Sequence, residues 1–144
     1  MTDVFSIALS GLGAQQKRLA GTASNIANAS TAGTVPGTVT SAPTSTAGGS
    51  TASGSTVYKP LNVNLTSLAS GGVRADVVAD ENGYSLAYDP SSPYANSEGM
   101  IAVPNVDLTT EMVNLLEIKT SYKANLAVLK TQDEMLGALL DTST

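Results

Sequence analysis

The sequence of 144 residues contains no cysteine, no histidine and no tryptophan, and it has a single phenylalanine. Without cysteine the chain forms no disulfide and offers no thiolate metal ligand or thiol nucleophile. Without histidine it also lacks the commonest general base and the commonest ligand of catalytic zinc. The glycines form no phosphate-binding loop, and the closely spaced Asp76 and Asp80 match no glycosidase signature. The residue types therefore predict a protein that is not an enzyme and that binds no cofactor or metal.

Positive charge is also scarce. Seven Lys and Arg residues are scattered among twelve Asp and Glu residues, which gives a net charge of −5. Nucleic acids require a basic face and anionic membranes a polybasic cluster, so neither partner is expected. No apolar run reaches about 18 residues, which predicts that no segment spans a membrane. Asp3 stands where a secretory signal carries positive charge, and Lys17 follows the apolar stretch, so no cleavable secretory signal peptide is expected.

The longest regular pattern is an apolar stripe between Asp107 and Asp141. Its members are spaced alternately by four and three residues: Leu108, Met112, Leu115, Lys119, Tyr122, Leu126, Leu129, Asp133, Leu136 and Leu140. This heptad spacing predicts one long helix that packs lengthwise against other helices. Lys119 and Asp133 interrupt the stripe. Such residues either extend to its rim, which we expect of Lys119, or pair with polar groups of a partner and fix its register; for Asp133 both alternatives stay open.

A second stripe with the same spacing predicts a helix over residues 3–28. It consists of Phe5, Leu9, Leu12, Gln16, Leu19, Ala23 and Ile26. Two stripes of equal period at opposite ends of the chain favour an antiparallel, coiled-coil-like pair of helices. Gly11, Gly13 and Gly21 each weaken the first helix by about 1 kcal/mol relative to Ala. We therefore expect neighbouring molecules to order it, the alternative being a poor amphipathic helix within a small bundle.

Small and amide side chains near this first helix indicate close contacts. The small residues Ala8, Gly11, Ala14, Ala20, Gly21 and Ala27 would let another helix approach closely. Asn25 and Asn28 share one face, where they would either bond the backbone of a neighbour or simply cap the helix end. Asn28 and Gly33 also suit a left-handed backbone at that end.

The middle of the chain divides into a linker and a small β module. Residues 34–56 are almost entirely Thr, Ser, Ala, Gly and Pro, and they predict a flexible linker. Residues 57–103 predict three or four short strands, over 58–65, 73–78, 84–88 and 99–104. Asn82-Gly83 lies between two apolar runs, which favours a hairpin between the second and third of these strands. Asn105 or Asp107 is expected to cap the long C-terminal helix.

Both ends of the chain carry short motifs that belong together. The N-terminal motif comprises residues 6–12, 18–19 and 24–28, followed by Thr31 and Gly33; the C-terminal motif comprises residues 88–93, Gly99, 103–106, 111–114, Tyr122 and 124–125. Together they resemble the bacterial flagellar rod and hook proteins, over roughly the first 30 residues and everything after about Lys59. One departure is Thr34, because the family usually has an aromatic residue there, followed by a basic stretch.

The resemblance implies an α+β fold in three parts. Residues 1–33 and 104–144 would form a helical core that is the inner layer of a tube, residues 34–56 the linker and residues 57–103 the β module outside it. It implies a structural subunit of the proximal flagellar rod, which transmits torque and lets exported subunits pass. The implied partners are copies of itself, other rod subunits and the flagellar type III export apparatus. The implied location is the periplasmic rod of the basal body, reached by export without a cleavable signal peptide.

The expected contacts between subunits combine both apolar stripes with the motif residues. They are Phe5, Leu9, Leu12, Leu19, Asn25, Ile26, Asn28, Pro104, Asn105, Met112, Leu115, Tyr122, Leu126, Leu129, Leu136 and Leu140. Three alternatives stay open: another short rod subunit, a soluble helical adaptor or export chaperone that dimerises through the C-terminal helix, and an enzyme that cleaves the cell wall. The missing acid and base residues argue against the last of these.

Overall fold

The computed structural model describes residues 2–37 and 56–142, so most of the expected linker lies outside the described residues. The elements are α1 (Thr2–Asn28), β1 (Leu61–Ser67), β2 (Val73–Ala79), β3 (Tyr84–Tyr88), β4 (Met100–Pro104) and α2 (Leu108–Thr142). These bounds agree closely with the two helices and four strands that the sequence predicts. Two long terminal helices with a small β module between them confirm the coarse α+β architecture.

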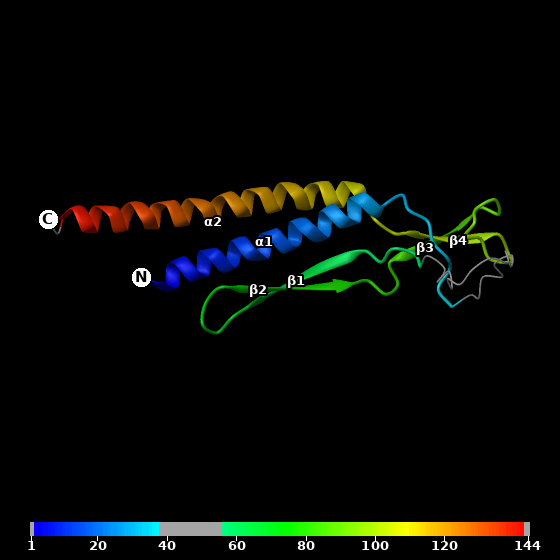
Figure 1. Cartoon of the computed structure of the whole chain (residues 1–144), viewed down its shortest axis with the longest axis horizontal. Helices are drawn as coiled ribbons and strands as arrows, with labels where there is room; N and C mark the ends of the chain where they lie inside the picture. Colours follow the sequence, from blue (N-terminus) through cyan, green and yellow to red (C-terminus); the bar gives the residue numbers. More distant parts are fainter. Residues whose placement is uncertain (1, 38–55, 143–144) are drawn as a thin grey trace, which may run out of the picture.

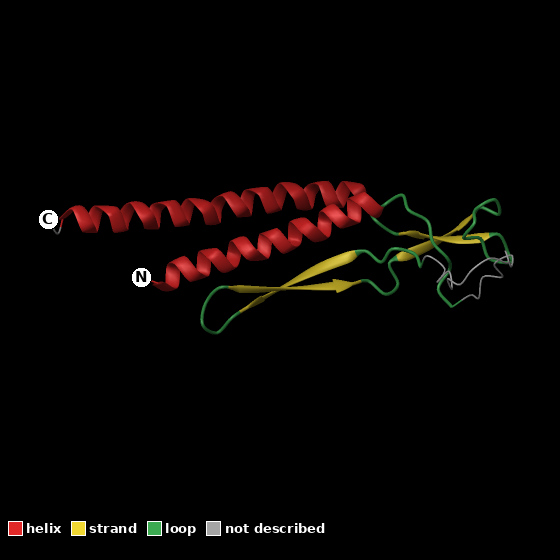
Figure 2. Cartoon of the chain, in the orientation of Figure 1, coloured by secondary structure: helices red, strands yellow, loops and turns green. Residues whose placement is uncertain are grey.

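The helix α1 is the middle layer of the elongated part of the molecule. Figures 1 and 2 show α2 running antiparallel along one side of α1 and the ribbon β1–β2 along the other side. The ribbon β3–β4 lies beyond the end where α1 stops and α2 starts. At the opposite end, α2 continues past the first residue of α1, so its last turns have no α1 beside them.

Asp107 begins α2. Its carboxylate accepts hydrogen bonds from the backbone N–H groups of Thr109 (2.8 Å) and Thr110 (3.4 Å) and from the Thr110 hydroxyl (3.0 Å). These bonds, the Thr110 hydroxyl first, lower the pKa of Asp107. Of the two expected capping residues, Asp107 is therefore the one that satisfies the free N–H groups of the first turn.

The strands form two separate antiparallel ribbons rather than one sheet. β1 pairs with β2, from Leu61 opposite Ala79 to Ser67 opposite Val73, and β3 pairs with β4. The predicted hairpin through Asn82-Gly83 is therefore wrong. The hairpin forms instead between β1 and β2, at Gly71-Gly72. Both glycines have φ of 86°, a backbone conformation that glycine adopts without steric cost. The segment 80–83 still turns, but it carries the chain from one ribbon to the other.

Gly33 is needed for a close approach rather than for a left-handed backbone. The described residues with positive φ are all glycines, and neither Asn28 nor Gly33 is among them, so that expectation is wrong. Gly33 instead exchanges two backbone hydrogen bonds with the buried Ala102 of β4, of 2.9 and 3.0 Å. A Cβ atom on Gly33 would overlap the backbone of Val57.

Replacing Gly33 should therefore destabilise the chain, whereas replacing Gly13 should not. Gly33→Ala would force the Val57 backbone apart, and overpacking of this kind costs about 1–3 kcal/mol. The matched control is Gly13→Ala, because no atom lies within 4 Å of a Cβ at that helical position. Gly13→Ala should stabilise by up to about 1 kcal/mol. Urea denaturation of both variants measures the two effects, and equal signs would contradict the assignment.

Candidate functional site: the faces of the helix pair

The face of α2 that meets α1 differs from the predicted apolar stripe. Its less exposed residues are Glu111, Asn114, Leu115, Ile118, Ser121, Tyr122, Asn125, Leu129 and Gln132. Leu115, Tyr122 and Leu129 belong to the predicted stripe. At four other positions of the stripe, Met112, Lys119, Leu126 and Asp133, the preceding residue is the less exposed one, for example Glu111 in place of Met112. The prediction that the two stripes face each other is therefore not confirmed.

The same displacement by one residue occurs in α1. Its buried residues are Ala8, Leu12, Ala14, Gln15, Gly21, Thr22 and Asn25. Of the predicted stripe, Leu12 is buried and Ile26 is half-buried, whereas Phe5, Leu9 and Leu19 are 46–54% exposed. Small and polar side chains thus make up most of the interior of the helix pair, together with Leu12 and Ile118, and most of the large apolar ones lie outside it.

Contacts of Gly11 and Arg18 explain which faces of α1 and α2 pack against each other. A Cβ atom on Gly11 would lie 2.7 Å from the side-chain amide nitrogen of Asn125, so the two helices approach closely at this glycine. Seven residues further on, Arg18 donates to both carboxylate oxygens of Glu117, at 3.4 and 3.1 Å. The Arg18 guanidinium lowers the pKa of the Glu117 carboxyl, first through its hydrogen bond and then through its charge. The expected close-approach surface is confirmed at Gly11, within one chain.

Asn25 joins three elements. Its side-chain oxygen accepts hydrogen bonds from the backbone N–H of Leu61 (2.7 Å) and the hydroxyl of Tyr58 (2.9 Å). Its side-chain nitrogen donates to the carbonyl of Leu61 (3.0 Å) and to the carboxylate of Glu111 (2.6 Å). With 3% exposure, the amide is fully satisfied inside the chain. Asn28, in contrast, donates to the Ser24 carbonyl at 2.8 Å, which is the local role at a helix end.

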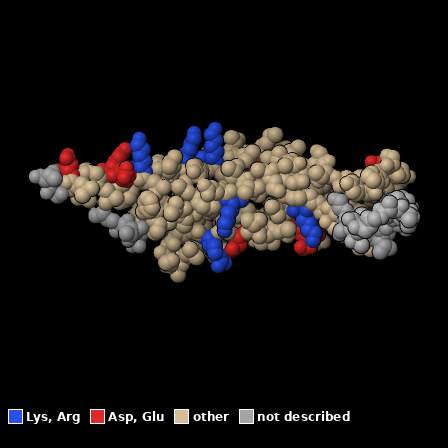
Figure 3. All heavy atoms as spheres, in the orientation of Figure 1, with Lys and Arg blue, Asp and Glu red and all other residues tan. Residues whose placement is uncertain are grey.

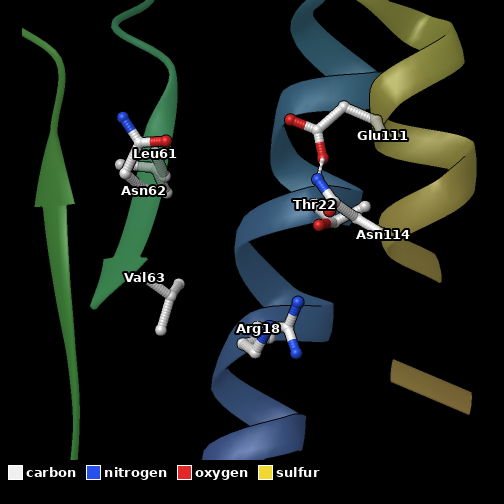
Figure 4. Close-up of a pocket in the computed structure, with 7 residues that line it drawn as sticks. All are labelled: Arg18, Thr22, Leu61, Asn62, Val63, Glu111 and Asn114. Carbon is white, nitrogen blue, oxygen red and sulfur yellow. Dashed lines mark hydrogen bonds between the residues drawn. The ribbon is translucent and has the colours of Figure 1, made fainter. Parts of the chain in front are cut away.

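A small polar cleft is lined in part by Leu61 and Glu111, the two residues to which Asn25 donates (Figure 4). It has a volume of about 210 Å³, and its walls come from α1, β1 and the start of α2: Arg18, Thr22, Leu61, Asn62, Val63, Glu111 and Asn114. Asn114 donates to Glu111 at 3.3 Å, so that carboxylate accepts from two amides. Within residues 2–37 and 56–142, no cluster of His, Cys, Asp and Glu side chains suits a metal ion. The cleft thus lies where the hydrogen bonds of Asn25 and Asn114 join α1, β1 and the start of α2.

An apolar groove of about 420 Å³ follows the outer junction of α1 and α2. Its lining residues are Gln15, Gln16, Leu19, Leu115, Ile118, Lys119, Tyr122, Lys123 and Leu126. The groove brings together four of the residues predicted to contact other subunits, namely Leu19, Leu115, Tyr122 and Leu126. None of the described helices is long and apolar enough to cross a bilayer, so the apolar lining is not part of a spanning helix.

The other predicted contact residues lie apart from the groove. Met112, Leu136 and Leu140 are exposed on α2, the last two in its final turns. Pro104 is buried at the end of β4, and the backbone N–H of Asn105 donates to the Gly83 carbonyl at 2.9 Å. Their contacts in an assembly stay a prediction.

The sequence reasoning missed the polar residues between the helices. Gln15, Arg18, Glu111, Glu117 and Gln132 were not among the predicted contact residues. For Gln15, Arg18, Glu111 and Gln132 the signal is a second heptad spacing, one residue before each apolar stripe, which small and polar side chains occupy along most of α1 and at several positions of α2. Glu117 lies outside this spacing.

Two family models match the ends of the chain. The model described as "Flagella basal body rod protein" matches residues 5–33, and the model described as "Flagellar basal body rod FlgEFG protein C-terminal" matches residues 97–142. These matches cover α1 from residue 5 onward, the strand β4 and all of α2.

Curated relatives match nearly the whole chain. The flagellar basal-body rod protein FlgC of Escherichia coli O6:H1 is 36% identical over 137 residues, which cover 94% of this chain and 92% of the relative. The protein of the same name from Salmonella typhimurium is 35% identical over 142 residues, with the same coverage. That of Agrobacterium fabrum is 32% identical over 147 residues, which cover 98% of this chain and 94% of the relative.

Removing the amide of Asn25 should destabilise the chain far more than removing that of Asn28. Asn25→Ala leaves both backbone groups of Leu61 without their side-chain partner, and a buried unpaired group costs about 1–3 kcal/mol. Asn28→Ala, the matched control, removes one local hydrogen bond and should cost about 1 kcal/mol or less. The free energy of unfolding in urea distinguishes them, and similar values would show that Asn25 does not join the elements.

The ion pair between Arg18 and Glu117 should make stability depend on pH. Because the pKa of Glu117 is lower when folded, its contribution is fully present above the ordinary value of 4.5 and is lost as the pH falls through the lowered value. Glu117→Gln should therefore lower the melting temperature at pH 7, and this difference from the parent should shrink towards pH 3.

The matched control is Glu134→Gln. Glu134 pairs with Lys130 of its own helix at 3.8 Å, and both side chains are mostly exposed. Such a pair contributes little, so the control should show no comparable change with pH. A Glu117→Gln difference that is equal at pH 7 and pH 3 would contradict the role of the ion pair.

Proposed function

This chain belongs to the family of flagellar basal-body rod proteins FlgC, and we propose that it polymerises through its terminal helices into the helical tube of the proximal rod. As a member of this family it is a structural rod subunit rather than an enzyme. In this tube, interlocked helices transmit the torque of the motor, and the central channel lets exported subunits pass. The observation that carries the proposal is the outward-facing apolar surface of the helix pair.

That surface is extensive on α2. Met112, Leu116 and Leu126 are 51–64% exposed, and the final turns add Met135, Leu136, Leu139 and Leu140, which are 42–71% exposed. Figure 3 shows that most of the visible surface over the helices is uncharged. Exposed apolar surface of this kind marks contacts between proteins, and covering it contributes about 25 cal/mol per Å². A tube in which neighbouring helix pairs pack side by side would cover it.

The contact residues proposed for this packing are the apolar ones that the chain leaves outside. Leu19, Leu115, Tyr122 and Leu126 offer a groove, and Phe5 and Leu9 extend the apolar surface along α1 towards its N-terminal end. Asn25 acts indirectly, since its hydrogen bonds hold α1 in the orientation that turns these side chains outward.

The small interior fits delivery through a narrow channel. In the part of the chain that the structure describes, half of the buried apolar residues are alanines: Ala8, Ala14, Ala75 and Ala102. An alanine buries little apolar area, so the free energy that opposes unfolding is modest. We propose that the flagellar type III export apparatus carries the chain in an unfolded state into the periplasm. There, other copies and other rod subunits of the basal body would stabilise α1.

A charge in the groove should abolish assembly. Leu126 is 51% exposed, so Leu126→Asp should leave the fold intact but put a carboxylate where a neighbour packs. We expect loss of swimming and of the chain from isolated basal bodies, while circular dichroism of the purified variant stays unchanged. The matched control is Leu86→Asp, because Leu86 is equally exposed, at 55%, on the remote strand β3.

Two outcomes contradict the proposal. Normal swimming of the Leu126→Asp variant would show that the helix faces are not assembly surfaces. A purified parent chain that forms a discrete dimer through α2 at nanomolar concentration, and is absent from basal bodies, would favour the helical adaptor instead.

A further inference from the structure

The apolar groove contains two lysines without a carboxylate partner. In the described part of the chain, Lys119 and Lys123 form no ion pair, whereas the other surface cations mostly do: Arg18, Lys59, Arg74 and Lys130 each pair with a carboxylate. Both unpaired lysines line the groove beside Leu115 and Leu126. The groove therefore fits a partner that is apolar and carries negative charge.

The final turns of α2 have this chemistry. They extend past the start of α1 (Figure 1), and Met135, Leu136 and Leu139 are 42–53% exposed there. Asp133 precedes them, is exposed, and forms no ion pair among the described residues. Figure 3 shows the acidic side chains over this end of α2 and the basic ones nearer its middle.

The spacing of Lys119 and Asp133 along α2 gives the offset between two copies of the chain. Lys119 and Asp133 are fourteen residues apart, which is two heptads, or about 21 Å along a helix. They cannot meet within one helix. If the α2 helices of two copies lie parallel and are displaced by two heptads, Asp133 of one faces Lys119 of the other.

The same displacement matches the remaining stripe residues. Leu126 then faces Met112, Leu136 faces Tyr122 and Leu140 faces Leu126, so apolar residues meet apolar ones. Parallel helices without displacement would instead place Lys119 opposite Lys119. A displacement by one heptad would place Lys119 opposite Leu126 and leave both charges unpaired, which is unfavourable when they are covered.

We propose that the final turns of α2 of one copy dock into the groove of the next copy, head to tail, with an offset of about 21 Å set by the pairing of Asp133 with Lys119. This inference rests on the proposed function, because an assembly that grows along an axis needs a contact that does not close on itself. An antiparallel pair centred on Leu126 would match the same charges, but it is twofold symmetric and ends with two copies.

Cysteine cross-linking in isolated basal bodies tests the offset, since the chain has no cysteine of its own. The Leu126→Cys/Leu140→Cys variant should give a ladder of disulfide-linked multimers under mild oxidation. Leu126→Cys alone should give no cross-link, and Met112→Cys/Leu140→Cys should give none either. Disulfide-linked dimers from either of the last two variants would overturn the inference, since they report an antiparallel or undisplaced pair.

Charge reversal tests the pairing itself. In the cross-linking background, Lys119→Glu and Asp133→Lys should each abolish the ladder, and the two together should restore it. The matched control is Lys130→Glu, because Lys130 pairs within its own helix; it should leave the ladder unchanged. Loss of the ladder in the combined reversal would overturn the pairing.

The outcomes also separate this inference from the proposed function. If the chain is present in basal bodies of swimming cells but Leu126→Cys/Leu140→Cys forms no ladder, the subunits assemble through another contact, and only the inference fails. If the parent chain is absent from basal bodies, the proposed function fails and the inference fails with it.

Discussion

The rest of the structure depends on the buried amide of Asn25. Its four hydrogen bonds reach β1, the Tyr58 hydroxyl before it, and Glu111 at the start of α2. A side chain that must satisfy two donors and two acceptors at once fixes the rotation of its helix about the helix axis. With Asn25 turned inward, the residues at heptad spacing from it, such as Arg18 and Gly11, also face α2. The apolar Leu9 and Leu19 are then turned away.

This rotation decides where the free energy of association comes from. Inside the chain the helices meet through small and polar groups, which contribute modestly because their hydrogen bonds replace those with water. Outside it, apolar residues such as Leu126 and Leu136 stay in contact with water until another helix covers them. A helix pair with the opposite rotation would hold its own apolar stripes together and offer neighbours less apolar surface. The weaker packing inside the chain thus leaves more apolar surface outside it for association with other helices.

The sequence predicts the elements of this fold well and their partners less well. The heptad spacing places α1 and α2 within a few residues of their observed bounds, and Asp107 is one of the two expected caps. Spacing shows that a stripe exists but not what covers it, and two stripes displaced by one residue run along each helix, so the heptad pattern alone does not say that Glu111 and Asn25 lie on the inner one. Strand pairing failed for a similar reason. Two turn signals competed, and the choice of Gly71-Gly72 over Asn82-Gly83 depends on how the ribbon fits against α1.

Charged residues within an apolar stripe can fix the offset between two packed helices, which apolar residues alone cannot. A stripe of leucines matches another stripe at every offset of seven residues, and each error displaces a neighbour by about 10 Å. One lysine and one aspartate two heptads apart remove this degeneracy, since every other parallel offset leaves a charge against an apolar residue or a like charge. The net charge of −5 adds a general repulsion between copies. Because of that repulsion, a contact that brings Asp133 to Lys119 in the groove is favoured over non-specific apolar association.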